Sequence, residues 1–228
     1  MTAAVAHEGN NVLLGMQITL GMLEKAARGD PEVAGHVARL RAGQGQLRRL
    51  FEEIRGHVAA VRPEWRACEL RSVWREAHRT VTALRPDVRV RLSERVAAAD
   101  PTCEADPVLL GRVFRNLFEN AAAACTGRVH IHVSCREAVV AGAPGLRVAV
   151  RDDGPGLTAE QRRRAFEPFY TTRSEGMGLG LAIARRVVRA HGGDLTVADR
   201  DEPGAEFVVL LPRAAVEGCG HERPGDRE

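Results

Sequence analysis

Apolar residues recur along the first quarter of the chain in alternating steps of four and three residues, which is the a/d spacing of a coiled coil or helical bundle. In residues 33–61 the positions are Val33, Val37, Leu40, Gln44, Leu47, Phe51, Ile54, Val58 and Val61. A matching series in residues 5–23 is Val5, Gly9, Val12, Met16, Thr19 and Leu23. Between the two series, Gly29 can end one helix, Asp30 can cap the next, and Pro31 suits its first position. The pattern predicts a helical hairpin.

A single hairpin leaves one apolar face uncovered. A second copy of the chain can cover that face, so we expect a homodimer held by a four-helix bundle. The hairpin is predicted to occupy residues 1–62 and to end at the linker residue Pro63.

After Pro63 the periodicity changes to a mixture of helices and strands. Helical patterns cover 69–84, 107–124 and 179–191, and alternating patterns typical of strands cover 88–92, 129–134, 146–151, 195–198 and 207–211. The turn-prone AGAPG joins the second and third strands. This order favours an α+β two-layer sandwich over residues 63–215, with helices on one face of a sheet. Residues 216–228 are polar and are predicted to be disordered.

Composition narrows the classes of function. Hydrophobic residues make up 44% of the 228 residues, enough for a real core, and no apolar run is long enough to span a bilayer. The net charge of +3 is too small and too dispersed to predict binding to nucleic acid or to an anionic membrane. Five cysteines without a CxxC pair indicate reduced thiols and a cytoplasmic protein.

Two asparagines stand four residues apart in the predicted helix 107–124. Asn116 and Asn120 therefore share one face of that helix. Their amide oxygens could hold a hard cation such as Mg²⁺ together with its waters. Taken alone, the pair is more often an ordinary polar helix face.

A second candidate follows the strand predicted at 146–151. Asp152 ends this strand and precedes Gly154 and Gly156. A carboxylate held there can accept a hydrogen bond from the amino group of a purine, and the glycines let the backbone approach the ring. A plain turn after a strand is the alternative.

The third candidate is a glycine-rich helix start. Gly176 and Gly178 precede the helix predicted at 179–191 and Gly180 lies in its first turn, where backbone N–H groups and the helix dipole can bind an anion. The order differs from the strand–GxGxxG–helix arrangement of a dinucleotide site.

These segments, taken in order, resemble the N, G1, F and G2 boxes of the sensor histidine kinases of two-component systems. The matching residues are Asn116…Asn120-Ala, Asp152-x-Gly154-Pro-Gly156, Phe166-Glu-Pro-Phe-Tyr-Thr-Thr-Arg173 and Gly176-x-Gly178-Leu179-Gly180-Leu. The resemblance covers residues from about 5 to 212 and implies a Bergerat-type (GHKL) ATP-binding domain, shared with gyrase, Hsp90 and MutL.

The resemblance also implies roles for individual residues. Asp152 would bind the adenine amino group, and Asn120 would coordinate Mg²⁺ with Asn116 in support. Gly178, Leu179 and Gly180 would present N–H groups to the triphosphate of ATP. Residues 171–176, which include Thr172 and Gly176, would form a short lid over the nucleotide, and Arg173 would reach a phosphate.

The same resemblance gives the N-terminus a catalytic role. His7-Glu8-Gly-Asn-Asn11 matches the phosphoacceptor motif of the family. The heptad phase independently places His7 at an f position, facing solvent. His7 would attack the γ-phosphate, Glu8 would accept the proton of the other ring nitrogen, and Asn11 would position water for dephosphorylating the partner.

The resemblance therefore implies a protein histidine kinase that passes the phosphoryl group to a response-regulator receiver domain. Gly9 replaces a bulky apolar residue, and Ala123 stands where many relatives have a phosphate-contacting lysine. Two alternatives remain open: a GHKL-type ATPase without phosphohistidine, and a non-catalytic dimeric scaffold that binds a receiver. No sensor-like segment precedes His7, so either a sensor belongs to a longer chain or a separate partner regulates this one.

Overall fold

The computed structural model divides the chain into two compact units, Met1–Ala60 and Val61–Glu228. The boundary lies close to the predicted linker residue Pro63. For residues 31 and 46–58 the structure describes the backbone only. The described residues are 14–25, 31–58, 61–97, 100–173, 177–199 and 203–215.

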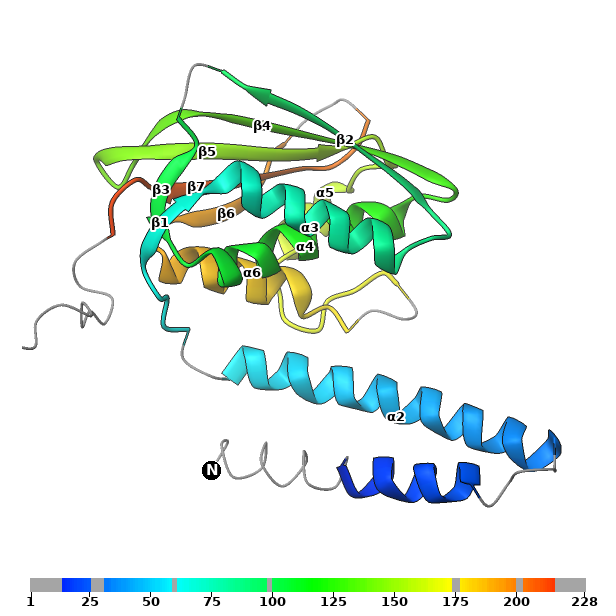
Figure 1. Cartoon of the computed structure of the whole chain (residues 1–228). Coiled ribbons are helices and arrows are strands. Elements are labelled where there is room, and N and C mark those ends of the chain that lie inside the picture. Colours follow the sequence, from blue (N-terminus) through cyan, green and yellow to red (C-terminus); the bar gives the residue numbers. More distant parts are fainter. Residues whose placement is uncertain are drawn as a thin grey trace, which may run out of the picture. The chain divides into compact units, whose positions relative to one another are not determined.

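The first unit contains two helical segments, residues 14–25 and α2 (Pro31–Val58) (Figure 1). An ion pair between Arg41 and Glu24 connects them. Leu20 and Val37 are buried, whereas several large apolar side chains of this unit are exposed. They are Leu14, Met16, Ile18, Met22, Leu23, Val33 and Leu40. Leu20 is not a member of the predicted heptad series, but it lies four residues from Met16 and three from Leu23 and so shares their side of the first helix.

The second unit is built on a five-stranded mixed sheet in the order β2-β4-β5-β7-β6. β2 runs parallel to β4, and the other neighbours are antiparallel. The strands are β2 (Arg89–Val96), β4 (Arg128–Val140), β5 (Ala143–Asp152), β6 (Asp194–Val197) and β7 (Glu206–Pro212). A separate antiparallel pair joins β1 (Arg66–Glu69) to β3 (Thr102–Ala105).

Three helices, α3 (Leu70–Leu84), α4 (Pro107–Ala124) and α6 (Gly180–Ala190), cover one face of this sheet (Figure 1). The core between the two layers contains Trp74, Phe114 and Phe118, each fully buried. Trp74 meets the edge of Phe114 with ring centroids 6.0 Å apart. The predicted two-layer α+β fold of the second unit is confirmed. Among the described residues, no helix is long and apolar enough to cross a membrane.

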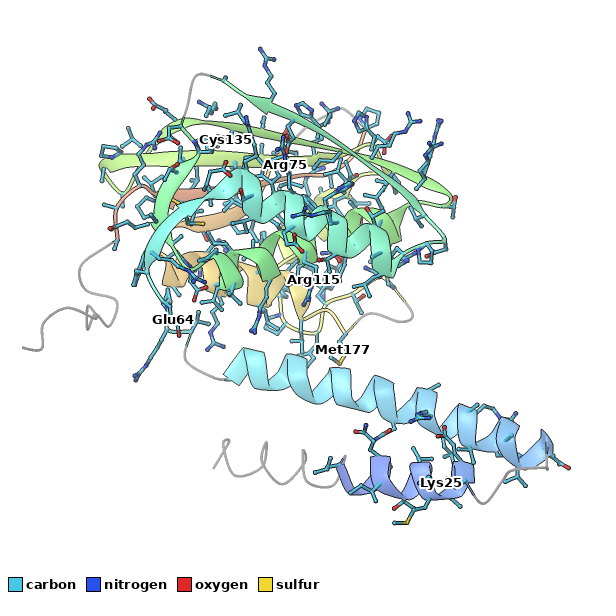
Figure 2. All side chains as sticks on the ribbon, in the orientation of Figure 1. Lys25, Glu64, Arg75, Arg115, Cys135 and Met177 are labelled. Carbon is cyan, nitrogen blue, oxygen red and sulfur yellow. The ribbon has the colours of Figure 1, made fainter. Side chains whose placement is uncertain are left out.

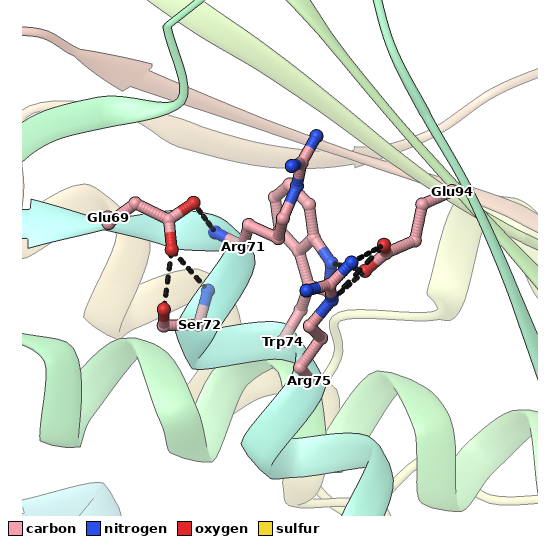
Figure 3. Close-up of polar contacts among 6 residues, drawn as sticks. All are labelled: Glu69, Arg71, Ser72, Trp74, Arg75 and Glu94. Atoms are coloured by element: carbon pink, nitrogen blue, oxygen red, sulfur yellow. Dashed lines mark hydrogen bonds and ion pairs between the residues drawn. The ribbon is translucent and has the colours of Figure 1, made fainter.

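Local sequence explains where these helices begin. Asp106 accepts hydrogen bonds from the backbone N–H groups of Val108 (2.9 Å) and Leu109 (3.0 Å), and Pro107 occupies the first turn of α4. Glu69 caps α3 in the same way (Figure 3). Because each cap supplies acceptors for N–H groups that have no partner within the helix, α4 starts where the sequence predicts.

The edge strand β2 is attached to α3 through one carboxylate. Glu94 accepts hydrogen bonds from Trp74 Nε1 (2.6 Å) and from Arg75 Nη2 (2.6 Å) (Figure 3). The hydrogen bond from Arg75 lowers the pKa of Glu94, against the opposing effect of its partial burial. These contacts connect the edge of the sheet to the helix layer (Figure 3). The side chain of Arg75 is also labelled among all the side chains in Figure 2.

The hydrophobic pattern of the sequence did not predict three short elements, which are β1, β3 and α5 (Ala159–Arg164). Four or six residues are too few to establish a periodicity. The predicted AGAPG loop also shrinks to a two-residue turn. Ala141 and Gly142 adopt φ of 50° and 83°, and Ala143 pairs directly with Val140. The primed type of hairpin turn explains this difference, since it needs left-handed residues only at its two central positions.

His191 holds the end of α6 against the start of α4. Its Nδ1 donates to the carbonyl of Val187 (2.8 Å), and its Nε2 accepts the backbone N–H of Asp106 (3.0 Å). This pairing defines a neutral ring, and burial lowers the pKa of His191 below its ordinary value of 6.5. These contacts give His191 a structural role.

The stability of the protein should therefore depend on pH through His191. Below pH 6.5 the unfolded chain gains a proton at this residue while the folded chain does not. The free energy of unfolding should then fall with decreasing pH at a slope approaching about 1.4 kcal/mol per pH unit from this group. Urea unfolding between pH 7.5 and 5.5 (roughly one unit either side of the ordinary value) measures the effect. His191→Gln should lack this component, and equal slopes in both proteins would contradict the assignment.

Candidate functional site

One cavity of about 310 Å³ opens beside the helix layer of the second unit. α4, the carboxyl end of β5, the segment before α6 and the first turn of α6 all contribute to it. Its volume is at the lower end of the range for small-molecule sites. Predicted site residues that line it are Asn120, Asp152, Gly156, Thr172, Arg173, Gly178 and Gly180.

Asp152 is buried at the base of this cavity with 8% of its surface exposed. Its Oδ1 accepts the backbone N–H groups of Gly154 (2.9 Å) and Ala205 (3.1 Å). Among the described residues no hydrogen bond reaches Oδ2. Burial raises the pKa of the carboxyl group above its ordinary value, although the two N–H donors oppose the shift. One oxygen is thus fixed by the backbone, and the other is available to a ligand.

Gly154 is required by this arrangement. A Cβ atom there would lie 2.9 Å from Asp152 Oδ1 and 3.1 Å from the sulfur of Cys125. Both distances are below ordinary contact, so a side chain would displace the carboxylate. Gly154 does not line the cavity itself; it allows its N–H group to reach Asp152.

The amino end of α6 enters the same cavity without a capping side chain. Leu179 precedes the helix and makes no side-chain cap hydrogen bond, and its own side chain is fully buried. The first hydrogen bond of the helix runs from the N–H of Ile183 to the carbonyl of Leu179 (2.9 Å). The N–H groups of residues 180–182 therefore have no partner within the helix, which makes this terminus a suitable site for an anion.

Asn120 and Arg173 meet at the mouth of the cavity. Arg173 Nη1 donates to Asn120 Oδ1 at 3.2 Å. This amide oxygen is the one predicted to bind Mg²⁺, so the guanidinium and the cation would share the same atom. Neighbouring Glu119 has a pKa raised by burial, partly offset by Arg115 and Arg173. Arg173 is the cationic residue of the cavity lining, while Ala123, at the position of the family's lysine, is also part of that lining.

Asn116 has a different place from Asn120. Its Nδ2 donates to the carbonyl of Gly180 at 3.2 Å, and it does not line the cavity. A Cβ on Gly180 would stand 3.4 Å from Asn116 Oδ1. Asn116 therefore contacts the start of α6, where it can orient the anion-binding terminus.

The segment before the cavity mouth is locked to the glycine-rich turn. Phe169 has a φ of 66°, rare for a bulky residue, and its N–H donates to the carbonyl of Gly178 at 3.1 Å. Gly178 also has a positive φ of 69°, and a Cβ there would lie 2.4 Å from the carbonyl oxygen of Tyr170. Neither segment can move alone without losing this contact.

Gly178→Ala should accordingly disturb both segments. We expect a loss of stability of about 1–3 kcal/mol, because the new side chain meets backbone atoms and favours negative φ. Nucleotide affinity should fall as well, since the turn leads into the amino end of α6. Gly43→Ala in α2 is the matched control, because no atom lies within 4 Å of its added Cβ. Urea unfolding and titration with a fluorescent ATP analogue measure both effects; a Gly178→Ala protein as stable as the wild type would contradict the argument.

Several residues that the sequence analysis missed form the apolar wall of the cavity. They are Ala121, Ala124, Leu157, Ala165, Leu181, Ala205 and Phe207. Tyr170 lines it too, and the guanidinium of Arg164 lies 4.1 Å from the centre of its ring. Ala121 and Ala124 are close to Asn120 in the sequence, which was an available signal. Leu157 and Leu181 likewise follow the predicted Gly156 and Gly180, whereas Ala165, Ala205 and Phe207 reach the cavity only through the tertiary fold.

Four predicted site residues, His7, Glu8, Asn11 and Gly176, lie outside the described residues. Their roles therefore remain predictions. Within the part of the chain that the structure describes, no group of three or more His, Cys, Asp or Glu side chains could hold a metal ion.

A protein-family profile described as histidine kinase-, DNA gyrase B- and HSP90-like ATPase matches residues 105–215, which carry the whole cavity. The second unit is an ATPase domain of this family. Its ATP-binding character is consistent with the buried aspartate and with the uncapped helix terminus described above.

Relatives extend the similarity beyond this domain. The chain is 32% identical over 217 residues to the sensor histidine kinase ZraS of Escherichia coli O157:H7, covering 93% of this chain and 45% of that protein. It is 38% identical over 127 residues to the signal transduction histidine-protein kinase/phosphatase MprB of Mycolicibacterium paratuberculosis, covering 52% and 24%. The chain is thus homologous to sensor histidine kinases and spans less than half the length of these relatives.

A solved structure shows the same relationship. Full-length ShkA in complex with AMPPNP superimposes with a TM-score of 0.76 at 25% identity, covering 95% of this chain and 46% of that one. The match with ZraS covers so much of this chain that it must include most of the helical hairpin.

Proposed function

We propose that the protein is an ATP-dependent protein histidine kinase that phosphorylates itself on His7 and passes the phosphoryl group to a response-regulator aspartate. One observation carries the nucleotide part of this proposal: buried Asp152, whose Oδ2 accepts no hydrogen bond among the described residues, and the uncapped amino end of α6 line one cavity. The carboxylate is suited to an adenine amino group, and the helix terminus to phosphates. ZraS and MprB are named histidine kinases, which supports the transfer of phosphate to histidine.

Different residues of the cavity bind the adenine and the phosphates of ATP. Asp152 accepts a hydrogen bond from adenine, whose ring lies against the apolar wall that includes Leu157, Leu181 and Phe207. N–H groups of Gly180 and its neighbours, together with Arg173, contact the phosphates. Gly156, which lines the cavity, lets the backbone come close to the base, and Gly154 holds the carboxylate of Asp152 in place.

Mg²⁺ fits this cavity as a companion of the nucleotide. The described lining offers it the amide oxygen of Asn120 and no carboxylate cluster. Such a site suits a cation that takes its other oxygen ligands from phosphates and water. When bound, the cation would neutralise charge on the phosphates during transfer. Arg173 donates a hydrogen bond to Asn120 in this structure. When the cation occupies Asn120, the phosphates would be the alternative partner of Arg173.

Chemistry at His7 follows from its neutral ring. One imidazole nitrogen attacks the γ-phosphorus in line, the bond to the β–γ bridging oxygen breaks, and ADP leaves. Glu8 accepts the hydrogen bond of the other ring nitrogen and makes the attacking nitrogen more basic. Asn11, one turn further on, is proposed to position water for hydrolysis of the phosphorylated partner, and MprB is named a kinase/phosphatase. Because ATP is the phosphoryl donor, we infer that this reaction takes place in the cytoplasm.

Incubation with γ-labelled ATP and Mg²⁺ tests this function. A kinase should acquire label that is lost in acid and stable in alkali, as expected for phosphohistidine. Release of labelled phosphate without labelled protein would instead indicate a GHKL-type ATPase. No turnover, with a receiver domain still bound, would indicate a non-catalytic scaffold.

Homodimerisation is part of the proposal, because the hairpin exposes a large apolar surface in a single chain. Leu40, Met22 and Ile18 are 57%, 66% and 54% exposed. A four-helix bundle formed with a second copy would bury such side chains at roughly 25 cal/mol per Å². Leu40→Glu should therefore shift the protein toward monomers in light scattering after size exclusion. The control is Leu84→Glu in the second unit, which is 62% exposed; an unchanged dimer in Leu40→Glu would contradict this interface.

A further inference from the structure

The sheet of the second unit has one face without helices, and its charge is strongly segregated. Core residues Val90, Val129, Ile131 and Val133 alternate with residues that point to the opposite side. On that opposite side, residues 89–95 of β2 and 128–136 of β4 contribute nine side chains, none of which is acidic. They are Arg89, Arg91, Ser93 and Arg95 in β2, and Arg128, His130, His132, Ser134 and Arg136 in β4. We refer to the five arginines of this set as the basic face.

All five arginines of the basic face are exposed. Across the described residues, none of them has an ion-pair partner. The chain as a whole has nearly as many acids as bases, 30 against 33. The preference of this protein for arginine over lysine does not explain why acids are missing from one face. The whole chain therefore has a low net charge although positive charge is concentrated locally on the basic face.

The strand register places positive charges of the basic face next to each other, which lowers the stability of the sheet. Arg89 lies directly opposite Arg128, whereas Arg147 of β5, which lies opposite Arg136, is ion-paired with Glu206 at 2.9 Å. Like charges in such positions destabilise a sheet. Protection of the edge strand explains charges on β2 but not those on β4, which is an interior strand. A function that needs the charge accounts for both strands.

We propose that the basic face docks on the surface of an anionic phospholipid bilayer. Arginines at alternate positions of β2 stand about 6.6 Å apart, and the two strands about 4.8 Å apart, so the guanidinium groups form a two-dimensional array. Such an array matches a plane of phosphate groups, each of which a guanidinium can bind through paired N–H donors.

Other anionic partners fit this surface less well. The outward positions of β2 and β4 carry no aromatic residue, so single-stranded nucleic acid finds no stacking platform. Over residues 89–95 and 128–136 they also carry no large apolar side chain that could anchor a protein partner, and Val140, further along β4 on the same side, is buried. The nucleotide cavity is lined from the helix layer and strand ends. Membrane contact through the basic face therefore leaves the cavity of the same unit open.

Co-sedimentation of the full chain with vesicles tests the proposal. Vesicles of phosphatidylglycerol and phosphatidylcholine in a ratio of about 3:7 should bind the protein, and pure phosphatidylcholine vesicles should not. Arg89→Gln/Arg91→Gln/Arg95→Gln should weaken binding to the anionic vesicles by at least about tenfold. Binding should also weaken as salt rises from about 0.05 to 0.3 M.

The matched control removes the same charge elsewhere. Arg79→Gln/Arg112→Gln/Arg163→Gln changes three exposed arginines on α3, α4 and α5 and should bind the anionic vesicles like the wild type. Both triple variants should keep the wild-type affinity for a fluorescent ATP analogue and an unfolding midpoint no lower than that of the wild type. Equal binding by the two triple variants, or no binding to anionic vesicles, would overturn the proposal. Tighter binding to a single-stranded or duplex oligonucleotide, lost in the β2 variant alone, would also overturn it.

Discussion

Asp152→Asn should lower the affinity for ATP roughly a hundredfold while leaving the fold intact. The asparagine carbonyl can keep both backbone hydrogen bonds, from Gly154 at 2.9 Å and Ala205 at 3.1 Å. Its amide group then takes the place of Oδ2 and points a donor at the amino group of adenine, which is also a donor. Losing a charge-assisted hydrogen bond and creating this conflict corresponds to about 2–3 kcal/mol.

Although Asp152→Asn should bind ATP more weakly, it should be at least as stable to unfolding as the wild type. Burial raises the pKa of Asp152, so folding with the carboxylate ionised costs stability. Removing the charge should hold or raise the unfolding midpoint. Inosine triphosphate has an acceptor in place of the adenine amino group, and the variant should discriminate against it less than the wild type does. Titration with ATP and inosine triphosphate, alongside thermal unfolding, measures these effects.

Asp153→Asn is the control for Asp152→Asn. Asp153 is exposed and accepts the backbone N–H of His130 at 2.8 Å, outside the cavity lining. ATP affinity in this variant should match that of the wild type. An Asp152→Asn protein that binds ATP normally would show that the carboxylate does not contact the base.

His7→Gln should abolish incorporation of label from γ-labelled ATP, because glutamine offers no nucleophilic nitrogen. Affinity for the fluorescent ATP analogue should stay at the wild-type level, since the nucleotide cavity is in the other unit of the chain. A loss of labelling without a loss of binding separates the nucleophile from the nucleotide site.

His36→Gln is the matched control for His7→Gln. His36 is an exposed histidine in α2, within hydrogen-bonding distance of Arg39, and lies outside the phosphoacceptor motif. Labelling should survive this change. Label that persists in His7→Gln, or disappears equally in both variants, would contradict the assignment of His7.

Motif residues that are close together in the sequence allowed the ATP-binding domain to be recognised without a structure. Asn120, Asp152 and Gly178 were predicted from short local patterns, and all three line one cavity. Asp106 and Pro107 likewise determined the start of α4, because capping depends on neighbouring residues only. The predicted roles of the residues near the N-terminus await the experiments above.

Tertiary structure decided what depends on contacts between distant segments. It separated Asn116, which contacts Gly180, from Asn120, which lines the cavity, although both lie on one helix face. It brought Phe207 and Leu157 to the same apolar wall.

The distribution of charge shows most clearly the difference between what the sequence determines and what the tertiary structure decides. The sequence has a net charge of +3, and from the sequence we expect this charge to be dispersed over the chain. Strand register instead places Arg89 opposite Arg128 and keeps acids off that side of β2 and β4. A net charge is a sum over residues and is set by the sequence alone, whereas an electrostatic surface depends on which residues the fold places side by side.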